Sequence, residues 1–125
     1  MKSEFYRCPI CGNIVYLVEG NAEHLTCCGK KMEKLVAGSV EAAREKHIPD
    51  VKKEDGKVIV QVGEVIHPMI KEHHIGWIAA VSEDSVEFKY LKPEEEPKAV
   101  FCNKDGRIKA VYAWCNLHGL WVKEI

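Results

Sequence analysis

Four of the six cysteines lie within the first 28 residues of this 125-residue chain, and their spacing limits what that segment can become. Cys8 and Cys11 form a Cys-x-x-Cys turn, and Cys27 and Cys28 follow as an adjacent pair. Such a turn places two thiolates on one ion, and four thiolates complete a tetrahedral shell. A segment this small needs a staple to fold. We therefore expect a metal-binding knuckle over residues 1–36, with two disulfides or free structural thiols as the alternative.

The adjacent cysteines place a condition on the backbone of this knuckle. Consecutive side chains of an extended strand point in opposite directions, so Cys27 and Cys28 reach one ion only where the chain twists sharply. Short apolar runs separated by glycine-containing turns predict a hairpin there. Thiolates alone do not distinguish zinc from iron, so the sequence leaves the metal open.

The remainder of the chain, residues 37–125, has the pattern of an antiparallel β-sandwich. Ser39, followed by good helix formers, predicts one short helix over 39–46 that stops before Pro49. Short apolar segments bounded by turn residues then predict strands over 58–62, 75–81, 86–91, 99–102, 108–114 and 120–123. Six or seven short strands at this spacing favour a sandwich, so the fold is expected to be mainly β.

Charge and hydropathy exclude several classes of function. Eighteen basic and 19 acidic residues leave a formal net charge of −1, so the chain lacks the basic field that nucleic acid or an anionic membrane requires. There is no apolar run of about 18 residues and no apolar segment before the first cysteine motif. Metal-binding thiols imply a reducing compartment. We expect a cytoplasmic protein that binds neither nucleic acid nor membrane.

A second set of potential ligands lies in the β-rich part of the chain. Its members are His47, His67, His73, Cys115 and His118. A single histidine is usually a surface residue or a satisfied core residue, so none of them is diagnostic alone. His74 directly follows His73 and, in an extended segment, faces the other way, so we do not expect it to be a ligand. Cys102 belongs to neither motif, and we expect it to be a small buried apolar side chain.

Taken together, these motifs resemble the desulfoferrodoxin family, the two-iron superoxide reductases. The resemblance spans nearly the whole chain and rests on Glu45-Lys46-His47-Ile48-Pro49, His67-Pro68-Met69, Cys115-x-x-His118-Gly119, and the four-cysteine knuckle with Gly12-Asn13-Ile14-Val15. It implies four equatorial imidazoles and one axial thiolate on a square-pyramidal iron. The matching residues are His47, His67, His73 and His118 for the imidazoles, and Cys115 for the thiolate.

The same resemblance implies the rest of the machinery. The sixth iron position is open, and Glu45 and Lys46 match the pair beside it. The lysine handles the superoxide anion, and the glutamate binds oxidised iron. A desulforedoxin-like knuckle over residues 1–36 holds the other iron, and residues 37–125 form an immunoglobulin-like sandwich in a homodimer. Single-iron members lack the four cysteines, so the knuckle is not obligatory for the chemistry, and the implied electron donor is rubredoxin-like.

The chemistry of these residue types agrees with the reduction, and so the detoxification, of superoxide. Neutral imidazoles leave a ferrous ion cationic enough to bind an anion, and an opposing thiolate donates electron density to it. The chain has no Gly-x-Gly-x-x-Gly nucleotide fingerprint, so the metal must be re-reduced from outside. Two other functions stay open. A dismutase is disfavoured by the donating thiolate, and a zinc-ribbon-like binding module is disfavoured by the near-zero net charge and the surplus histidines.

Overall fold

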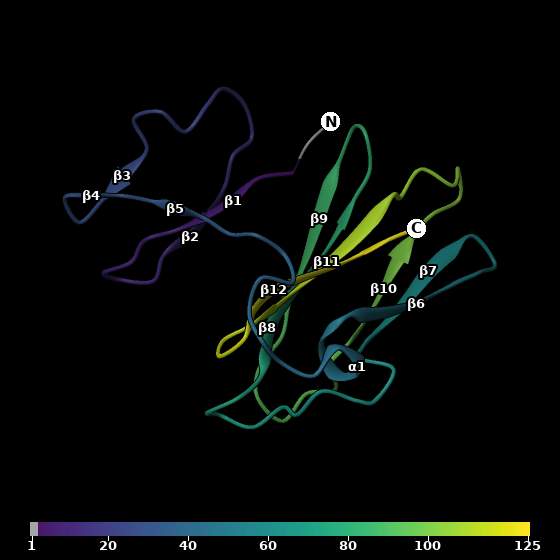
Figure 1. Cartoon of the computed structure of the whole chain (residues 1–125). Helices are drawn as coiled ribbons and strands as arrows, with labels where there is room; N and C mark the ends of the chain where they lie inside the picture. Colours follow the sequence, from purple (N-terminus) through teal and green to yellow (C-terminus); the bar gives the residue numbers. More distant parts are fainter. Residues whose placement is uncertain (1–2) are drawn as a thin grey trace. The chain divides into compact units, whose positions relative to one another are not determined.

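The chain folds as two compact units in this computed structural model, which describes residues 3–125. We call Met1–Val36 the N-terminal unit and Ala37–Ile125 the C-terminal unit. Both are built from antiparallel strands, as the sequence predicts, and a single helical turn is the exception among the described residues (Figure 1). None of the helical structure in residues 3–125 has the length and apolar character needed to cross a membrane.

The N-terminal unit is a pair of small sheets around a very small core. One sheet has the order β2-β1-β5 and the other is the hairpin β3-β4. The strands are β1 (Phe5–Arg7), β2 (Ile14–Tyr16), β3 (Thr26–Cys27), β4 (Lys30–Lys31) and β5 (Glu33–Lys34). Its buried apolar cluster consists of Tyr6, Cys8 and Met32, and Phe5 is buried as well. So little buried apolar surface contributes little stability, which fits a unit that depends on its cysteines.

The C-terminal unit is a sandwich of two antiparallel sheets. The three-stranded sheet β10-β7-β6 consists of β6 (Pro49–Glu54), β7 (Lys57–Val62) and β10 (Lys98–Cys102). The four-stranded sheet β12-β11-β8-β9 consists of β8 (Ile75–Val81), β9 (Val86–Tyr90), β11 (Ala110–Cys115) and β12 (Gly119–Glu124). The sequence did not predict β6, because this edge strand is mostly charged and is ordered by its pairing with β7.

The core of the sandwich follows from strict alternation along β7 and β10. Val58, Val60 and Val62 point inward and are fully buried, and on β10 the inward positions are Ala99 and Phe101. The same alternation turns the last residue of β10 outward. The expectation that Cys102 is buried was therefore wrong, because its side chain is exposed on the outer face of the sheet.

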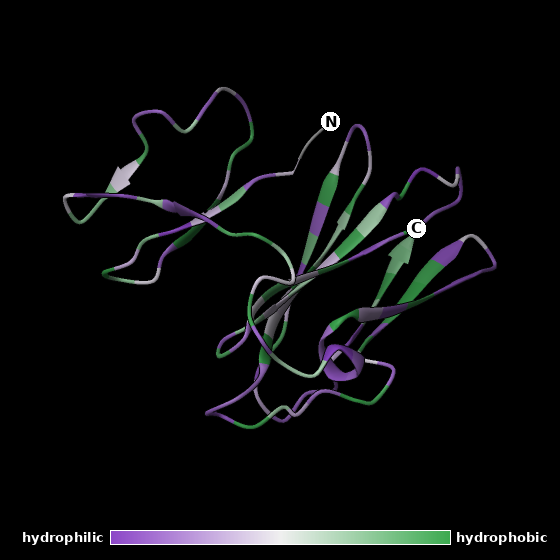
Figure 2. Ribbon diagram, in the orientation of Figure 1, coloured by the Kyte–Doolittle hydropathy of each residue, from purple (hydrophilic) through white to green (hydrophobic). Residues whose placement is uncertain are grey.

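The predicted helix over 39–46 is much shorter than expected. Only α1 (Arg44–His47) is helical, and Ala43 precedes it in extended conformation with no side-chain cap, so Ser39 is not its N-cap. The upstream segment is held against β12 instead, where the Gly38 amide donates to the Leu120 carbonyl at 2.8 Å. Figure 2 shows α1 as hydrophilic, and His47 is its only buried residue.

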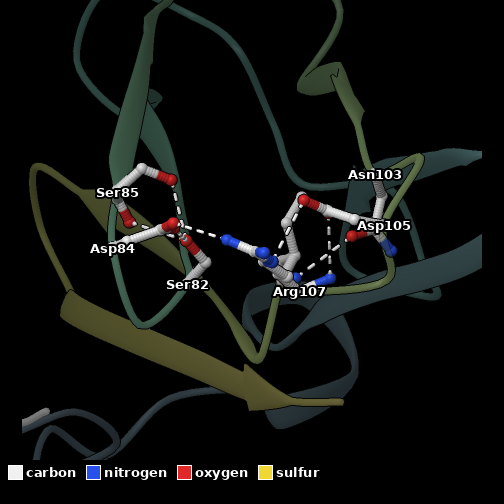
Figure 3. A network of polar contacts seen from close by, with 7 residues as sticks. Ser82, Asp84, Ser85, Asn103, Asp105 and Arg107 are labelled. Atoms are coloured by element: carbon white, nitrogen blue, oxygen red, sulfur yellow. Dashed lines mark hydrogen bonds and ion pairs between the residues drawn. The ribbon is translucent and has the colours of Figure 1, made fainter.

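Two loops at the end of the sandwich where β8 finishes are joined by polar contacts (Figure 3). The Arg107 guanidinium lies 2.7 Å from Asp84 across the loops and 3.2 Å from Asp105 within its own loop. The Ser82 hydroxyl donates to Asp84 at 3.0 Å. Exposed ion pairs of this kind contribute at most about 1 kcal/mol. At this end of the sandwich, the two loops are therefore joined by ion pairs between Arg107 and the carboxylates of Asp84 and Asp105.

Gly63, just after β7, is the tightest glycine position at the other end of the sandwich. Its φ is +85°, and a Cβ there would lie 2.2 Å from the Val65 carbonyl oxygen and 2.7 Å from the Lys46 carbonyl oxygen. A side chain at this position must therefore displace the backbone of α1 or of the loop after β7.

Replacing Gly63 with alanine should lower the free energy of unfolding by about 3 kcal/mol, because left-handed strain adds to a backbone clash. Gly106→Ala is the matched control, since Gly106 also has a positive φ, +69°, but has nothing within 4 Å of the added Cβ. The control should cost only about 1 kcal/mol. Urea unfolding of the two variants measures the difference, and equal losses would contradict the clash.

Candidate metal centres

The four cysteines of the N-terminal unit converge at one point. Their sulfur atoms all lie within 4.8 Å of one another. The Cys11 and Cys27 sulfurs are 3.6 Å apart, and those of Cys27 and Cys28 are 3.9 Å apart. Cys28 has a φ of +53°, which is the sharp twist that two adjacent cysteines require to face one ion. The set has the composition and spacing of a closed tetrahedral thiolate site.

Hydrogen bonds within the knuckle already favour a thiolate at its centre. The amides of Cys11 and Ile10 donate to the Cys8 sulfur, each at 3.4 Å, and lower the pKa of Cys8 to about 6. The pKa of Cys27 is raised to about 12, first of all by its hydrogen bond with Cys11. No disulfide joins any of the six cysteines. A metal cation would replace the protons that these crowded sulfurs otherwise have to share.

The second ligand set gathers at one end of the sandwich in the C-terminal unit. His47 ends α1, His67 and His73 lie in the loop between β7 and β8, and Cys115 ends β11. Antiparallel pairing places these segments together, because β8 begins at the end where β11 finishes. One ligand atom from each of these four residues lies within 4.8 Å of all the others.

His118, in the turn between β11 and β12, joins the same cluster. Its Nδ1 is 3.1 Å from the Nε2 of His47 and 3.9 Å from the Cys115 sulfur. The ring centroids of His73 and His118 are 4.9 Å apart. The four-residue group includes neither His118 nor His74, but these contacts place the His118 ring against three of its members.

Two backbone carbonyls determine which ring nitrogens face the centre. The Nδ1 of His47 bonds to the Ala43 carbonyl at 2.7 Å, and the Nδ1 of His67 bonds to the Pro68 carbonyl at 2.7 Å. A carbonyl only accepts, so each Nδ1 carries the proton and each neutral ring turns a lone pair outward from Nε2. These two Nε2 atoms are 3.2 Å apart. Two facing lone pairs repel each other unless a cation lies between them, so the donor set fits a metal ion.

Burial keeps these imidazoles in the neutral form that binds metals. It lowers the pKa of His67 to about 4, and the neighbouring histidines add to that effect. Burial also lowers the pKa of His47 and of His73. The buried Nε2 of His73 has no hydrogen-bond partner among the described residues. An orphaned acceptor in this position is what a metal ion would satisfy.

Cys115 supplies the single sulfur of this cluster from a fully buried position. The β8–β11 register shifts between Trp114 and Cys115, at the end of the strand next to the histidines. Burial raises the pKa of the thiol, and the backbone amides of His118 and Leu117 partly offset it. The His118 amide lies 3.4 Å from the sulfur, in the turn that joins β11 to β12. These amides also temper the electron donation of a metal-bound thiolate.

Glu45 and Lys46 lie on α1 directly before His47, and both are exposed. Burial is the main cause of the lowered pKa values of His47 and His73, and the positive charge of Lys46 adds to both shifts. The positive charge of Lys46 therefore acts on the two histidines in the same direction as burial. The Glu45 carboxylate is outside the group of ligand atoms, while its backbone carbonyl accepts the Val65 amide at 2.9 Å.

Trp121 supports the cluster in a way that sequence reasoning missed. Its side chain is buried, its indole N–H donates to the His118 carbonyl at 3.0 Å, and its ring centroid is 5.0 Å from that of His47. In the sequence, a tryptophan in a predicted strand indicates only a core residue. The roles of the Ala43 and Pro68 carbonyls also cannot be predicted from the sequence, because every residue has a backbone carbonyl.

Comparison with known proteins gives a consistent result over the whole chain. Residues 39–124 match the profile of the family described as "Desulfoferrodoxin", and residues 1–35 match "Desulfoferrodoxin, N-terminal domain". A desulfoferrodoxin of Syntrophotalea carbinolica is 44% identical over 98% of this chain and 97% of its own length. A protein named superoxide reductase from Pyrococcus horikoshii is 39% identical over 65% of this chain and 86% of its own. The crystal structure of the superoxide reductase from Treponema pallidum superposes with a TM-score of 0.81 at 29% identity, covering 99% of this chain and 100% of that one.

The two ligand sets lie in separate units, so they should lose metal independently. Cys11→Ser should reduce the metal content from two ions to one per chain and remove the sulfur-to-metal absorption of the knuckle, because one of its four thiolates is missing. Cys102→Ser is the matched control, since this exposed cysteine belongs to neither set. Metal analysis with visible spectroscopy provides the measurement. Loss of both metals from a folded Cys11→Ser protein would show that the sites depend on each other.

Proposed function

The chain belongs to the desulfoferrodoxin family, and from that premise we propose that it is a superoxide reductase. The reaction consumes one superoxide, one electron and two protons and yields one hydrogen peroxide. The observation that carries the proposal is the pair of Nε2 lone pairs of His47 and His67, facing each other at 3.2 Å beside a buried cysteine. This arrangement suits a redox-active metal held by imidazoles and one thiolate.

Both metals are proposed to be iron. In the C-terminal unit the ligands are the Nε2 atoms of His47, His67 and His73, the Nδ1 of His118 and the sulfur of Cys115. In the N-terminal unit they are the sulfurs of Cys8, Cys11, Cys27 and Cys28. An iron ion held by the five ligands of the C-terminal unit supplies the electron that superoxide takes up. The thiolate of Cys115 raises electron density at the metal, and its burial keeps water away from the sulfur.

Lys46 is proposed to attract superoxide and to order water molecules around the bound anion. Its charge already acts on His47 and His73, and its exposed side chain is free of the metal-ligand group. With a formal net charge of −1 on the whole chain, a local cation dominates the approach of a small anion. Water held by the ammonium is a source of the two protons that the product requires.

Glu45 is proposed to bind the oxidised metal. A carboxylate is a harder ligand than imidazole and prefers the ferric to the ferrous ion. Glu45 lies two residues before the ligand His47 on the same helical turn, which keeps it near the cluster. Its exposed side chain is able to approach or leave without disturbing the core.

The electron donor, the assembly and the compartment are proposed on the basis of the same family membership. We propose a rubredoxin-like protein as donor, because the chain has no nicotinamide or flavin fingerprint and one-electron chemistry suits a one-electron carrier. We propose a homodimer as the working state. We place the protein in the cytoplasm, where unpaired cysteines such as these stay reduced.

The reduced protein should convert superoxide to hydrogen peroxide in a one-to-one ratio when an external reductant is in excess. It should release no dioxygen, because the electron comes from the metal and not from a second superoxide. Parallel peroxide and oxygen assays test this, with metal-free protein as the control. Dioxygen release together with one peroxide for every two superoxide ions would identify a dismutase instead.

Lys46→Ile should react with superoxide several-fold more slowly than the unmodified protein, with unchanged metal content. At several ångströms in a wet site the lost attraction is a few tenths to about 1 kcal/mol, and salt screens it. The rate of the isoleucine variant should therefore depend less on ionic strength, while Lys46→Arg should retain most of the rate. Pulse radiolysis across a salt series measures all three. Equal rates and equal salt slopes for the isoleucine variant and the unmodified protein would rule out steering.

A further inference from the structure

Asn116 binds the backbone on both sides of a metal ligand that lies in a different loop. Its Oδ1 accepts the amide of His74 at 2.9 Å, and its Nδ2 donates to the carbonyl of Glu72 at 3.0 Å. Its own backbone amide also donates to the carbonyl of His74, at 3.2 Å. His73 is the residue between these two. A single residue of the β11–β12 turn thus brackets the peptide units on either side of His73.

These hydrogen bonds matter because the half-buried His73 is held differently from the buried His47 and His67. The rings of His47 and His67 are anchored through Nδ1 to the carbonyls of Ala43 and Pro68. In the described part of the chain, the His73 ring has no carbonyl of this kind, and its buried Nε2 has no partner. Its direction therefore depends on the backbone that carries it. That backbone is held by Asn116 and by a reciprocal pair of hydrogen bonds with Ile70, both at 3.1 Å.

Asn116 is also the immediate neighbour of Cys115. The same turn carries the sulfur ligand, the bracket and, two residues later, the ligand His118. A shift of this turn would consequently be transmitted to His73 through three hydrogen bonds. The hydrogen bonds of Asn116 therefore help to fix the distance between the sulfur of Cys115 and the ring of His73.

We propose that Asn116 is a positioning residue that sets the place of His73 relative to Cys115 and so completes the metal site. The proposal rests on the metal site of the proposed function, but not on its reaction with superoxide. Asn116 is exposed and lies outside the ligand atoms, so it acts through His73 and not by direct contact with the metal. Loss of a hydrogen-bonding partner behind a ligand typically weakens metal binding about 10- to 100-fold.

The test measures Co²⁺ affinity by titration of metal-free full-length chain against a competing chelator. All proteins carry Cys11→Ser, so that the C-terminal site is the only complete one. Asn116→Ala should weaken Co²⁺ binding about 10- to 100-fold and change the visible spectrum of the bound ion. Asn116→Asp keeps an acceptor for the His74 amide but loses the donor to the Glu72 carbonyl, so it should give an intermediate loss. Lys71→Ala, an exposed residue of the same loop, is the matched control and should bind Co²⁺ normally.

A double-mutant cycle separates positioning of His73 from general support of the turn. In a His73→Ala background, Asn116→Ala should weaken Co²⁺ binding by less than about threefold, because the ligand that it positions is already absent. A full loss in that background, or no loss in the background that retains His73, would overturn the proposal. Thermal unfolding confirms that the variants are folded, and Asn116→Asp supplies the same comparison should Asn116→Ala not fold. Absence of superoxide reduction in the unmodified protein would count against the proposed function alone, because every readout here is metal binding.

Discussion

The structure of the C-terminal site depends on the repulsion between two imidazole lone pairs. The carbonyls of Ala43 and Pro68 take the Nδ1 protons of His47 and His67, and this leaves both Nε2 lone pairs facing one centre at 3.2 Å. Both side chains are buried, so water does not relieve the repulsion. Protonation is also opposed, because burial lowers both pKa values. A metal cation between the two rings would accept both lone pairs, and the hydrogen bonds to the Ala43 and Pro68 carbonyls orient the rings for it.

The sandwich makes this arrangement possible because its strands bring distant segments to one end. The ligand cysteine lies at the end of β11, and β8 pairs with that strand from the point where the loop carrying His67 and His73 finishes. The well-packed valines of β7 give the loop a rigid starting point. At the opposite end, the ion pairs of Arg107 close the loops on themselves. The two ends of one sheet thus serve different purposes, ligand presentation and loop closure.

The N-terminal unit depends less on apolar burial and more on its cysteines than the sandwich does. Its buried apolar cluster is small, and its cysteines lie close enough for one ion to hold all four sulfurs. Metal binding in such a unit also supplies folding free energy, whereas the sandwich has a core of its own. Because the ligands of each centre come entirely from one unit, we expect metal binding at one centre to be independent of metal binding at the other.

Cysteine spacing and strand patterning were enough to predict the four-cysteine group and the mainly β class, whereas the histidine and cysteine set of the C-terminal unit was predicted from the resemblance to desulfoferrodoxins. These features can be predicted because they are local patterns in the sequence. They comprise the cysteine spacing, the alternation in β7 and the motifs around His47, His67 and Cys115. The long helix expected over 39–46 and a buried Cys102 were wrong, because a contact with β12 replaced the first and the outward register of β10 decided the second. Only the tertiary structure decided which ring nitrogens face the metal and that Asn116 brackets His73. Those features depend on backbone groups from segments far apart in the chain, and every residue type carries the same backbone groups.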